Sequence, residues 1–388
     1  MDVGVFMRVE RVRNSGIDNV PLGWRLILLI TTIAISGPIF AQQPLIDDAS
    51  IVVRVRSVVD TAMQRPEAVG LSVAVGHGDR VLLEAGFGLA ELEHEVAANA
   101  NTVFRVGSIT KQFTAAAIMK LVENENLGLD DNVRTYLPKL VAENRTITIR
   151  QLLNHSSGIP SYTSQQDFWI YGVMRELTVE ELLGFVEDVP FDFEPGSGWN
   201  YSNTGYYVLG PIIEQVDGRP YSQFLEEEFF QPLGLDNTRY DSNRDVIPNR
   251  AQGYSFDEET SKLLNDYLIG MANPGAAGGL LSTAGDLIRW QMALTTGDVV
   301  SVESYEQMIM PAPIETDGPM SYGFGLRIRE TEAGEIDLIQ HGGRINGFNS
   351  MLSWMPEPDL HVAILSNSEG LASRAIAREI FRSIVGTE

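Results

Sequence analysis

Segments that alternate like β-strands stand near both ends of the chain, and segments with helical spacing fill its middle. The stretch "AVGLSVAVGHGDRVLLEAGFGLAE" alternates over residues 69–75, turns at 77–79 and continues over 81–87, which predicts an antiparallel hairpin. Strand-like texture returns from about residue 318 in "YGFGLRIRE", "EIDLIQHGG", "FNSMLSWMPEP" and "LHVAILSNS". This distribution lacks the strand–helix alternation of a parallel sheet, so it predicts an α+β fold whose antiparallel sheet is built from both chain ends.

The residues between about 130 and 275 are expected to form an inserted, mainly helical lobe. Short amphipathic pieces punctuated by Pro and Gly follow one another there, in "TIRQLLNHSSGIP", "TVEELLGFVEDVP", "GYYVLGPIIEQVDG" and "PYSQFLEEEFFQPLGL". A last amphipathic helix carries apolar residues at Leu371, Ile376, Ile380, Phe381 and Ile384. Residues 42–388 are therefore predicted to be a single two-lobed domain, with helices flanking the sheet and a ligand site in the cleft between the lobes.

The first 41 residues are predicted to be a signal peptide with an N-terminal extension. Four arginines precede an apolar stretch over 26–35, a Ser-Gly-Pro sequence ends it, and Ala41 supplies a small residue for cleavage. A transmembrane helix needs about 20 apolar residues, which this stretch does not reach. A periplasmic or secreted protein is expected; the alternative is a membrane anchor formed by an uncleaved segment at 24–41.

Charge and residue usage exclude several partners and chemistries. The 388-residue chain has 52 acidic and 28 basic residues, a net charge of −24, so neither nucleic acid nor anionic lipid is an expected partner. It has no cysteine, which excludes thiolate nucleophiles, thiolate metal sites and disulfides. The five histidines have no metal-binding spacing, and no dinucleotide loop or P-loop is present. No metal and no organic cofactor are expected.

One serine stands at a spacing that suits nucleophilic catalysis. No serine lies in G-x-S-x-G, so the nucleophile turn of the α/β-hydrolases is absent. In "VFRVGSITKQF", however, Ser108 precedes Lys111 by three residues, and the chain has only four lysines. On a helix the two side chains share a face, and lysine, unlike arginine, can lose its proton where charge is disfavoured. The pair is a candidate nucleophile and activator, although chance also produces this spacing.

Two further short segments combine polar side chains with turn residues. "WNYSNTGY" contains Tyr201 and Asn203, and "IQHGGRINGF" contains His341, Gly342 and Gly343 directly after an alternating strand. Paired glycines at a strand end let another group approach the backbone closely. Taken alone, each segment also fits a buried tyrosine or a solvent-exposed histidine.

In this order, the three segments resemble the serine β-lactamase and penicillin-binding protein superfamily. Ser-x-x-Lys, then Tyr-x-Asn about 90 residues later, then His-x-Gly on a late strand is similar to the class C β-lactamase-like branch, with its family VIII esterases, D-aminopeptidases and D-alanyl-D-alanine carboxypeptidases. Secondary segments resemble it too: "LLNHSSGIP", "PGSGWNYSNTGY", "LGLDNT", "GGLLSTAGDL" and "GFNSMLSWMPE". The resemblance covers about residues 55–385.

The resemblance implies that Ser108 is the nucleophile of an acyl-transfer reaction. At the start of a helix, its backbone N–H has no intrahelical acceptor and can bind an oxyanion. A second donor is expected just past Gly342 and Gly343, at the N–H of Arg344, whose side chain is a candidate substrate contact. Two such donors lower the barrier by several kcal/mol.

The resemblance also implies roles for the other polar residues. Lys111 and Tyr201 are expected to work as a unit on the serine proton, and which of them is the base stays open. Asn203 is expected to hydrogen-bond the substrate amide or Lys111. His155, within "LLNHSSGIP", is expected to be scaffold. His341 completes the predicted catalytic set.

The third segment departs from the Lys-Thr-Gly that β-lactamases of this branch carry. A histidine with an ordinary pKa near 6.5 is mostly neutral at pH 7, so His341 is expected to attract an anionic substrate more weakly than lysine does. The sequence therefore favours an exported serine hydrolase that forms an acyl-enzyme with small esters or D-amino-acid amides and peptides. The alternatives are a β-lactamase, a D-alanyl-D-alanine carboxypeptidase, and a non-catalytic binder of cell-wall peptides.

Overall fold

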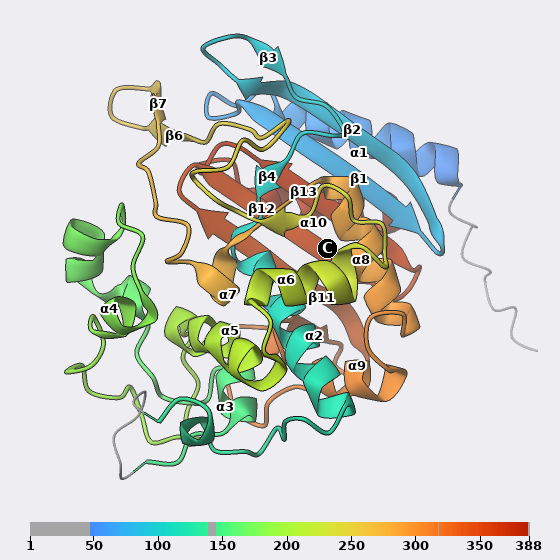
Figure 1. Ribbon diagram of the computed structural model, residues 1–388. Helices are drawn as coiled ribbons and strands as arrows, with labels where there is room; N and C mark the ends of the chain where they lie inside the picture. Colours follow the sequence, from blue (N-terminus) through green and yellow to red (C-terminus); the bar gives the residue numbers. More distant parts are fainter. Residues whose placement is uncertain (1–46, 139–144, 317, 387–388) are drawn as a thin grey trace, which may run out of the picture. The chain divides into compact units, whose positions relative to one another are not determined.

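An antiparallel sheet built from both ends of the chain organises the fold (Figure 1). The computed structural model describes residues 47–138, 145–316 and 318–386, so the predicted signal peptide lies outside the described residues. Across the described part of the sheet the strand order is β3 (Val96–Ala97), β2 (Arg80–Glu91), β1 (Gly70–His77), β13 (Leu360–Ser366), β12 (Phe348–Met355), β11 (Ile336–Ile345), β10 (Arg327–Glu330) and β9 (Ser321–Tyr322). The predicted hairpin and the pairing of the two chain ends, here β1 with β13, are confirmed.

One face of this sheet packs against the two terminal helices, α1 (Asp48–Ala62) and α10 (Ser373–Val385). Alternation decides which residues reach it: Leu71, Val73 and Val75 of β1 belong to this apolar cluster, whereas Ala74 belongs to the cluster on the opposite face. Helix α1 adds to the predicted elements; Asp47 caps it by accepting a hydrogen bond from the Ser50 N–H.

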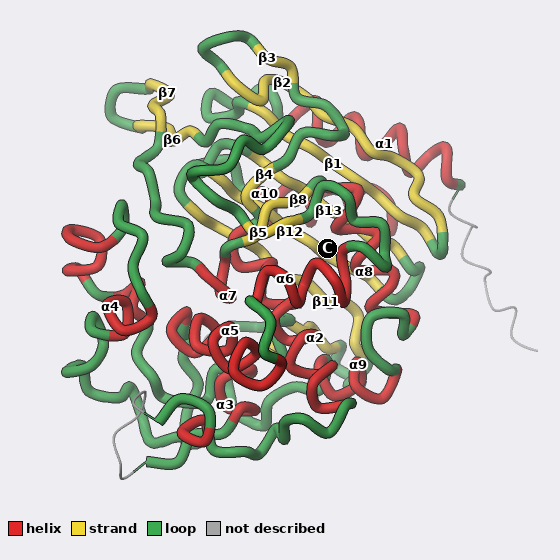
Figure 2. The backbone as a smooth tube through the Cα atoms, in the orientation of Figure 1, coloured by secondary structure: helices red, strands yellow, loops and turns green. Residues whose placement is uncertain are grey.

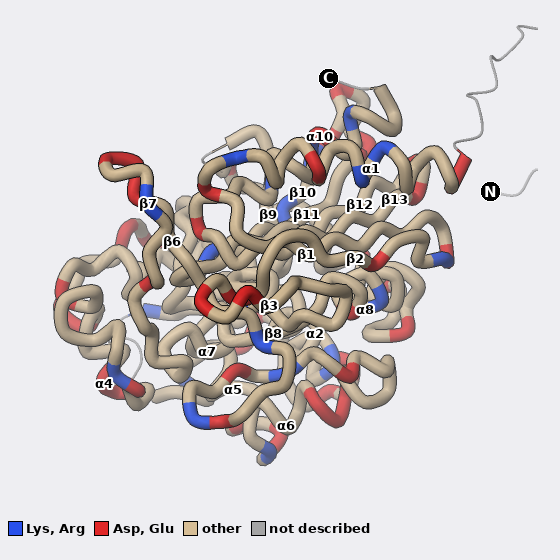
Figure 3. Tube along the Cα trace, turned by 90° about the horizontal axis from the view of Figure 1, so that it is seen from above, with Lys and Arg blue, Asp and Glu red and all other residues tan. Residues whose placement is uncertain are grey.

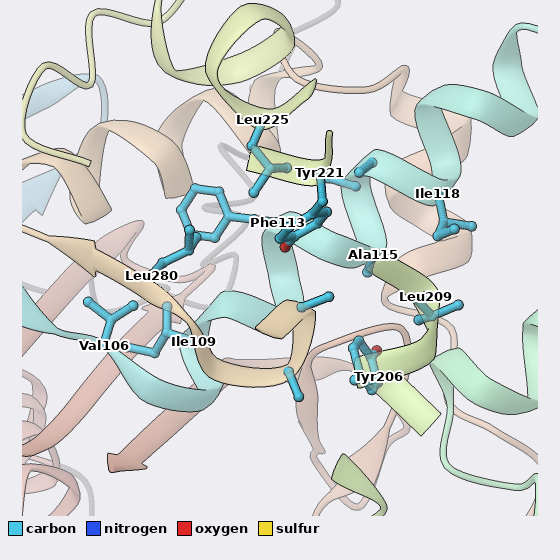
Figure 4. Packing of buried hydrophobic residues seen from close by; sticks show 14 of the residues in the cluster. Val106, Ile109, Phe113, Ala115, Ile118, Tyr206, Leu209, Tyr221, Leu225 and Leu280 are labelled. Atoms are coloured by element: carbon cyan, nitrogen blue, oxygen red, sulfur yellow. The ribbon is translucent and has the colours of Figure 1, made fainter. Parts of the chain in front are cut away.

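The opposite face packs against α8 (Ala284–Thr296). Small residues of β1 allow this helix to approach: a Cβ added to Gly76 would lie 2.2 Å from the Met292 Cε atom. Helix α2 (Thr110–Glu123) follows the predicted nucleophile and is buried along nearly its whole length. Its Phe113 lies in the apolar packing shown in Figure 4. The Phe113 ring stacks on that of Trp290 of α8 at a centroid distance of 3.8 Å.

The middle of the chain is mainly helical, as predicted, and Figure 2 shows it beside the strands of the sheet. It contains the α-helices α3 (Ile149–Leu153), α4 (Val179–Leu183), α5 (Asn203–Asp217), α6 (Tyr221–Leu225) and α7 (Gly275–Gly278). It also contains the 3-10 turns η2 (Val133–Thr135) and η3 (Tyr162–Ser164) and the π-helical turns η4 (Phe168–Gly172) and η5 (Glu226–Phe230). Helix α9 (Val302–Met308) follows α8.

The structure also contains short strands that the sequence did not predict, both within the expected helical lobe at 130–275 and on either side of it. Strands β4 (Phe104–Arg105), β8 (Leu280–Ser282) and β5 (Arg239–Tyr240) form a small sheet, and β6 (Tyr254–Asp257) pairs with β7 (Lys262–Asn265). Two- to four-residue strands are too short to show alternation, so their pairing depends on long-range contacts.

Charged residues recur along the surface loops and helix ends, with acidic residues prominent (Figure 3). Across the described ranges, no helix combines the length and apolar character that crossing a membrane requires.

Candidate active site

Ser108 lies in a one-turn 3-10 helix, η1 (Gly107–Ile109), that leads directly into α2. Gly107 before it has φ +52°, a left-handed conformation that glycine adopts without strain. A Cβ at Gly107 would also lie only 3.0 Å from the backbone N of Arg344. Glycine at this position therefore brings the nucleophile turn against strand β11.

Strand β11 offers a free stretch of backbone to this turn. Strand β10 pairs with its first half, from Ile336 to Gln340, and the pairing stops there. Beyond that point, Gly343 packs so closely that a Cβ would lie 1.9 Å from the Val106 carbonyl oxygen, and the Ser350 hydroxyl donates a 2.7 Å hydrogen bond to that oxygen. The predicted oxyanion donors, the N–H groups of Ser108 and Arg344, thus lie on two adjoining segments.

The Lys111 side chain is completely buried and its Nζ atom lies among three oxygens. The Ser108 Oγ is 3.1 Å away, the Asn203 Oδ1 2.8 Å and the Ala277 carbonyl oxygen 2.7 Å. Two of these oxygens can only accept hydrogen bonds, whereas the serine hydroxyl can also donate. An ammonium can donate to all three oxygens, whereas a neutral amine can donate to the two carbonyl oxygens and accept from the Ser108 hydroxyl with its lone pair.

Burial favours the neutral form of Lys111. Desolvation holds the pKa of its amine well below the usual value near 10.5, because the charged form loses hydration that the surroundings do not replace. The described residues near Nζ supply dipolar oxygens but no carboxylate partner. The site therefore favours the form of Lys111 that can accept a proton.

Tyr201 lies in the loop before α5, and the Lys111 Nζ stands 4.9 Å from the centre of its ring. Burial raises the pKa of the phenol above its usual value, while the positive charge of Arg327 acts in the opposite direction. Its hydroxyl oxygen is buried without a hydrogen-bond partner among the residues that the structure describes. Tyr201 thus stands beside the predicted nucleophile as a protonated phenol.

The Asn203 amide is held in one orientation by hydrogen bonds at both ends. Its Oδ1 accepts from Lys111, its Nδ2 donates to the Thr163 Oγ1 at 3.0 Å, and its backbone N–H donates to the Ser161 Oγ at 3.1 Å. Of the two partners expected for Asn203, the structure shows Lys111. Thr163 and Ser161 belong to the same polar group but carry no signal in the sequence that would have singled them out.

His341 is 3% exposed, and both of its ring nitrogens have partners. Nδ1 donates to the Gly342 carbonyl oxygen at 2.7 Å, and Nε2 accepts from the Tyr322 hydroxyl at 2.9 Å. Burial lowers the pKa of the imidazole to about 3. An ordinary histidine was expected from the sequence; burial makes His341 more firmly neutral than that.

Arg327 of β10 brings a positive charge that the sequence analysis missed. Its guanidinium carbon lies 5.7 to 5.9 Å from the ring centres of Trp199, Tyr201 and Tyr322. In "YGFGLRIRE" this residue looks like one polar position of an alternating strand, so the sequence offers no reason to prefer it over Arg329.

The Arg344 side chain is exposed and forms an ion pair with Glu369, with Nε 2.7 Å from Oε1. Close by, a cavity of about 280 Å³ is lined by residues from several loops, including Arg105, Asn346, Phe348, Tyr267 and Leu268. A second hollow, of about 620 Å³, lies along the helical segment between Gln165 and Val189.

Among the described residues, no cluster of His, Asp and Glu side chains could hold a metal ion.

Together, the two-ended antiparallel sheet and the Ser108–Lys111–Tyr201–Asn203 group define a serine hydrolase of the β-lactamase and transpeptidase fold. The family model described as "Beta-lactamase" matches residues 55–386, and the chain belongs to that family. This confirms the family and the enzyme class predicted from the sequence.

Individual relatives cover most of the chain. Penicillin-binding protein 4* of Bacillus subtilis is 31% identical over 81% of this chain and 71% of its own length. The solved structure of the octameric penicillin-binding protein homologue from Pyrococcus abyssi is 32% identical, with a TM-score of 0.74 over 87% of this chain and 78% of that one. That of a D-stereospecific amidohydrolase from Streptomyces sp. is 28% identical, with a TM-score of 0.74 over 88% of this chain and all of that one.

Proposed function

We propose that this protein is an exported serine hydrolase that forms an acyl-enzyme on Ser108 with small esters or D-amino-acid amides and peptides. One observation carries the proposal: the buried Lys111 amine faces the Ser108 hydroxyl with its other directions taken by acceptor oxygens. This arrangement has no evident use in a binding protein, because it buries an amine at a cost in stability.

In the first half of the reaction, neutral Lys111 accepts the proton of Ser108 as its Oγ attacks the substrate carbonyl carbon. The negative charge that develops on the carbonyl oxygen is stabilised by the N–H groups of Ser108 and Arg344. The bond to the leaving alcohol or amine then breaks, and the proton passes to that group from Lys111 by way of the Tyr201 phenol. An ester of Ser108 remains.

In the second half, a water molecule attacks this ester and gives its proton to the same Lys111–Tyr201 unit. The carboxylic acid leaves and the proton returns to Ser108. Lys111 is the base in this scheme because burial lowers the pKa of the amine and raises that of the phenol, so the amine is the group that is free to accept a proton.

The substrate preference follows from the absence of a charged third motif. His341 is neutral, so this position cannot offer the ammonium that Lys-Thr-Gly enzymes are expected to use for a substrate carboxylate. The similarity to a D-stereospecific amidohydrolase supports amides of D-amino acids as one substrate class. A second candidate function, hydrolysis of β-lactams or of D-alanyl-D-alanine ends, is favoured by one observation: Arg327 brings a cation close to Tyr201.

Intact-protein mass spectrometry tests the proposal most directly. The protein is exposed briefly to a p-nitrophenyl ester, a D-alanyl-p-nitroanilide and a chromogenic cephalosporin, with Ser108→Ala as the control and turnover followed in parallel. We expect an adduct and rapid turnover with ester or D-amide in the unaltered protein alone, with the cephalosporin slow or stalled. Fast cephalosporin turnover would favour the β-lactamase alternative, and absence of adduct and turnover with all three would overturn the proposal.

Export is supported by the arginines, apolar stretch and small residue of positions 1–41. The mass of the protein recovered from a bacterial periplasmic fraction tests it. A chain beginning near residue 42 is expected; full-length protein in the membrane fraction would favour the anchor at 24–41.

A further inference from the structure

His155 holds the loop that carries Tyr201 on both sides of the tyrosine. The backbone N–H of Asn200 donates to the His155 carbonyl oxygen at 3.2 Å, and the N–H of Ser202 donates to its Nδ1 atom, also at 3.2 Å. Between these two hydrogen bonds, the imidazole packs against the Tyr201 ring at a centroid distance of 4.3 Å. One residue thus contacts the backbone before Tyr201, its ring, and the backbone after it.

His155 is itself firmly held. It is 1% exposed and adopts φ +63°, a conformation that non-glycine residues keep only where their surroundings fix it. Its ring also packs against those of Tyr322, at 4.6 Å, and Tyr206, at 5.1 Å. The Tyr206 hydroxyl in turn donates a 2.6 Å hydrogen bond to the carbonyl oxygen of Leu153, the last residue of α3.

The hydrogen bond from Ser202 defines the form of the imidazole. Because Nδ1 accepts, the ring is neutral with its hydrogen on Nε2, and a protonated ring could not accept this bond. Burial, with the positive charge of Arg327 acting in the same direction, holds the pKa of His155 well below its ordinary value and so keeps the acceptor available. The His155 Nε2 atom is buried without a partner among the described residues. Within that part of the chain, the hydrogen bond from the Ser202 N–H to Nδ1 is therefore the one that the imidazole makes.

We propose that His155 is a positioning residue, whose neutral Nδ1 and ring face fix the Tyr201 phenol beside Ser108 and Lys111. From the sequence, His155 is expected to be scaffold; positioning Tyr201 is a narrower task. Tyr201 needs such a support because its own hydroxyl has no hydrogen-bond partner in the described structure to fix the ring. Catalytic groups displaced by about 1 Å can lose about 10²-fold in rate, so a support of this kind acts on the chemical step. The proposal rests on the proposed function of Ser108 and Tyr201.

Two substitutions of similar polarity separate positioning from general packing. In His155→Asn the side-chain oxygen can take the place of Nδ1, and asparagine tolerates the left-handed conformation. In His155→Gln the oxygen falls one atom further out, near the place of Nε2, and cannot take the Ser202 N–H. His361→Asn serves as the matched control, because His361 is also 1% exposed but lies on β13 with Gln291 and Asp359 as partners.

Two measurements on the folded full chain keep the outcomes distinct. The first is steady-state hydrolysis of a p-nitrophenyl ester, resolved into kcat and KM. The second is hydrogen–deuterium exchange of the peptide that spans 196–206, which needs no activity. We expect His155→Gln to lower kcat by about 10²-fold with little change in KM and to speed exchange of this peptide, while His155→Asn stays within about tenfold on kcat. The control is expected to change neither.

The proposal is overturned if Asn and Gln variants lose rate equally, or if the Gln variant exchanges like the unaltered protein. If the unaltered protein does not acylate, the proposed function fails, while the exchange data still decide whether His155 fixes the loop. If the Gln variant does not fold, the Asn variant decides. The proposal is then overturned if His155→Asn loses as much activity as Tyr201→Phe and also loses exchange protection of the 196–206 peptide.

Discussion

The two faces of the central sheet differ in how many titratable side chains they bury. The face covered by α1 and α10 packs through an apolar cluster of residues such as Ile51, Val55, Leu71 and Ile380. The other face, with α2, α8 and the helical segment, has a larger apolar core that encloses a buried amine and three neutral imidazoles. Burying such polar groups opposes folding unless hydrogen bonds replace their hydration.

This difference indicates a division of labour between the faces. The terminal-helix face contributes mainly burial of apolar area, about 25 cal/mol per Å². The other face also buries titratable groups whose pKa values are shifted, as is common at active sites. Substitutions on the two faces should therefore separate activity from stability.

Replacing Lys111 by methionine should give the largest effect, on activity alone. Met has a similar length and no amine, so Ser108 loses its proton acceptor and kcat/KM should fall by about 10²–10⁴-fold or more. The free energy of unfolding should change by less than about 2 kcal/mol, because relief of the buried amine offsets the acceptors left at Asn203 and Ala277. Ester kinetics and denaturant unfolding measure the two quantities. Activity within tenfold of the unaltered protein would assign the proton transfer to Tyr201 instead.

Replacing Ile380 by alanine should give the converse result. Ile380 of α10 is fully buried in the apolar cluster, so the cavity should lower the free energy of unfolding by about 2–5 kcal/mol. Turnover per folded molecule should not change, since α10 packs on the far side of the sheet from Ser108. Val53→Ala on α1, where Val53 is 68% exposed, is the control and should shift stability by less than about 0.5 kcal/mol. A parallel fall in kcat would show that the two faces are coupled.

Acid should weaken the fold through its buried histidines, as a smaller and graded effect. The pKa of His341 is lowered to about 3 and that of His361 to about 4, both chiefly by burial, against about 6.5 in an unfolded chain. Between these values the unfolded chain binds protons that the folded chain excludes. Stability is therefore unaffected by them above pH 6.5 and falls as pH drops towards 4, by at most about 1.4 kcal/mol per pH unit for each histidine.

Denaturant unfolding at several pH values between 7.5 and 4.5 measures this slope. His361→Asn should flatten it relative to the unaltered protein, because Asn cannot bind the proton. An unchanged slope in this variant would mean that His361 is protonated in the folded state as readily as in the unfolded one.

The sequence determined the elements that depend on local periodicity and on motif spacing. Alternation in "LSVAV" and "LHVAILS" predicted the strands that pair at the centre of the sheet, and Ser108–Lys111 with Tyr201 and Asn203 predicted the group that the structure brings together. Side chains on one face recur every two residues in a strand and about every 3.6 residues in a helix. These patterns are therefore visible within a short stretch of sequence.

The tertiary structure decided whatever depends on burial and on contacts between distant segments. Nothing in "IQHGGRI" shows that His341 is enclosed and neutral, nothing in "GLRIRE" selects Arg327, and nothing in "LLNHSSGIP" places His155 against Tyr201. A pKa is set by the hydration that a group loses and by charges contributed from other elements, which no short stretch of sequence contains. The residue types were readable from the chain; their protonation, partners and support came only with the fold.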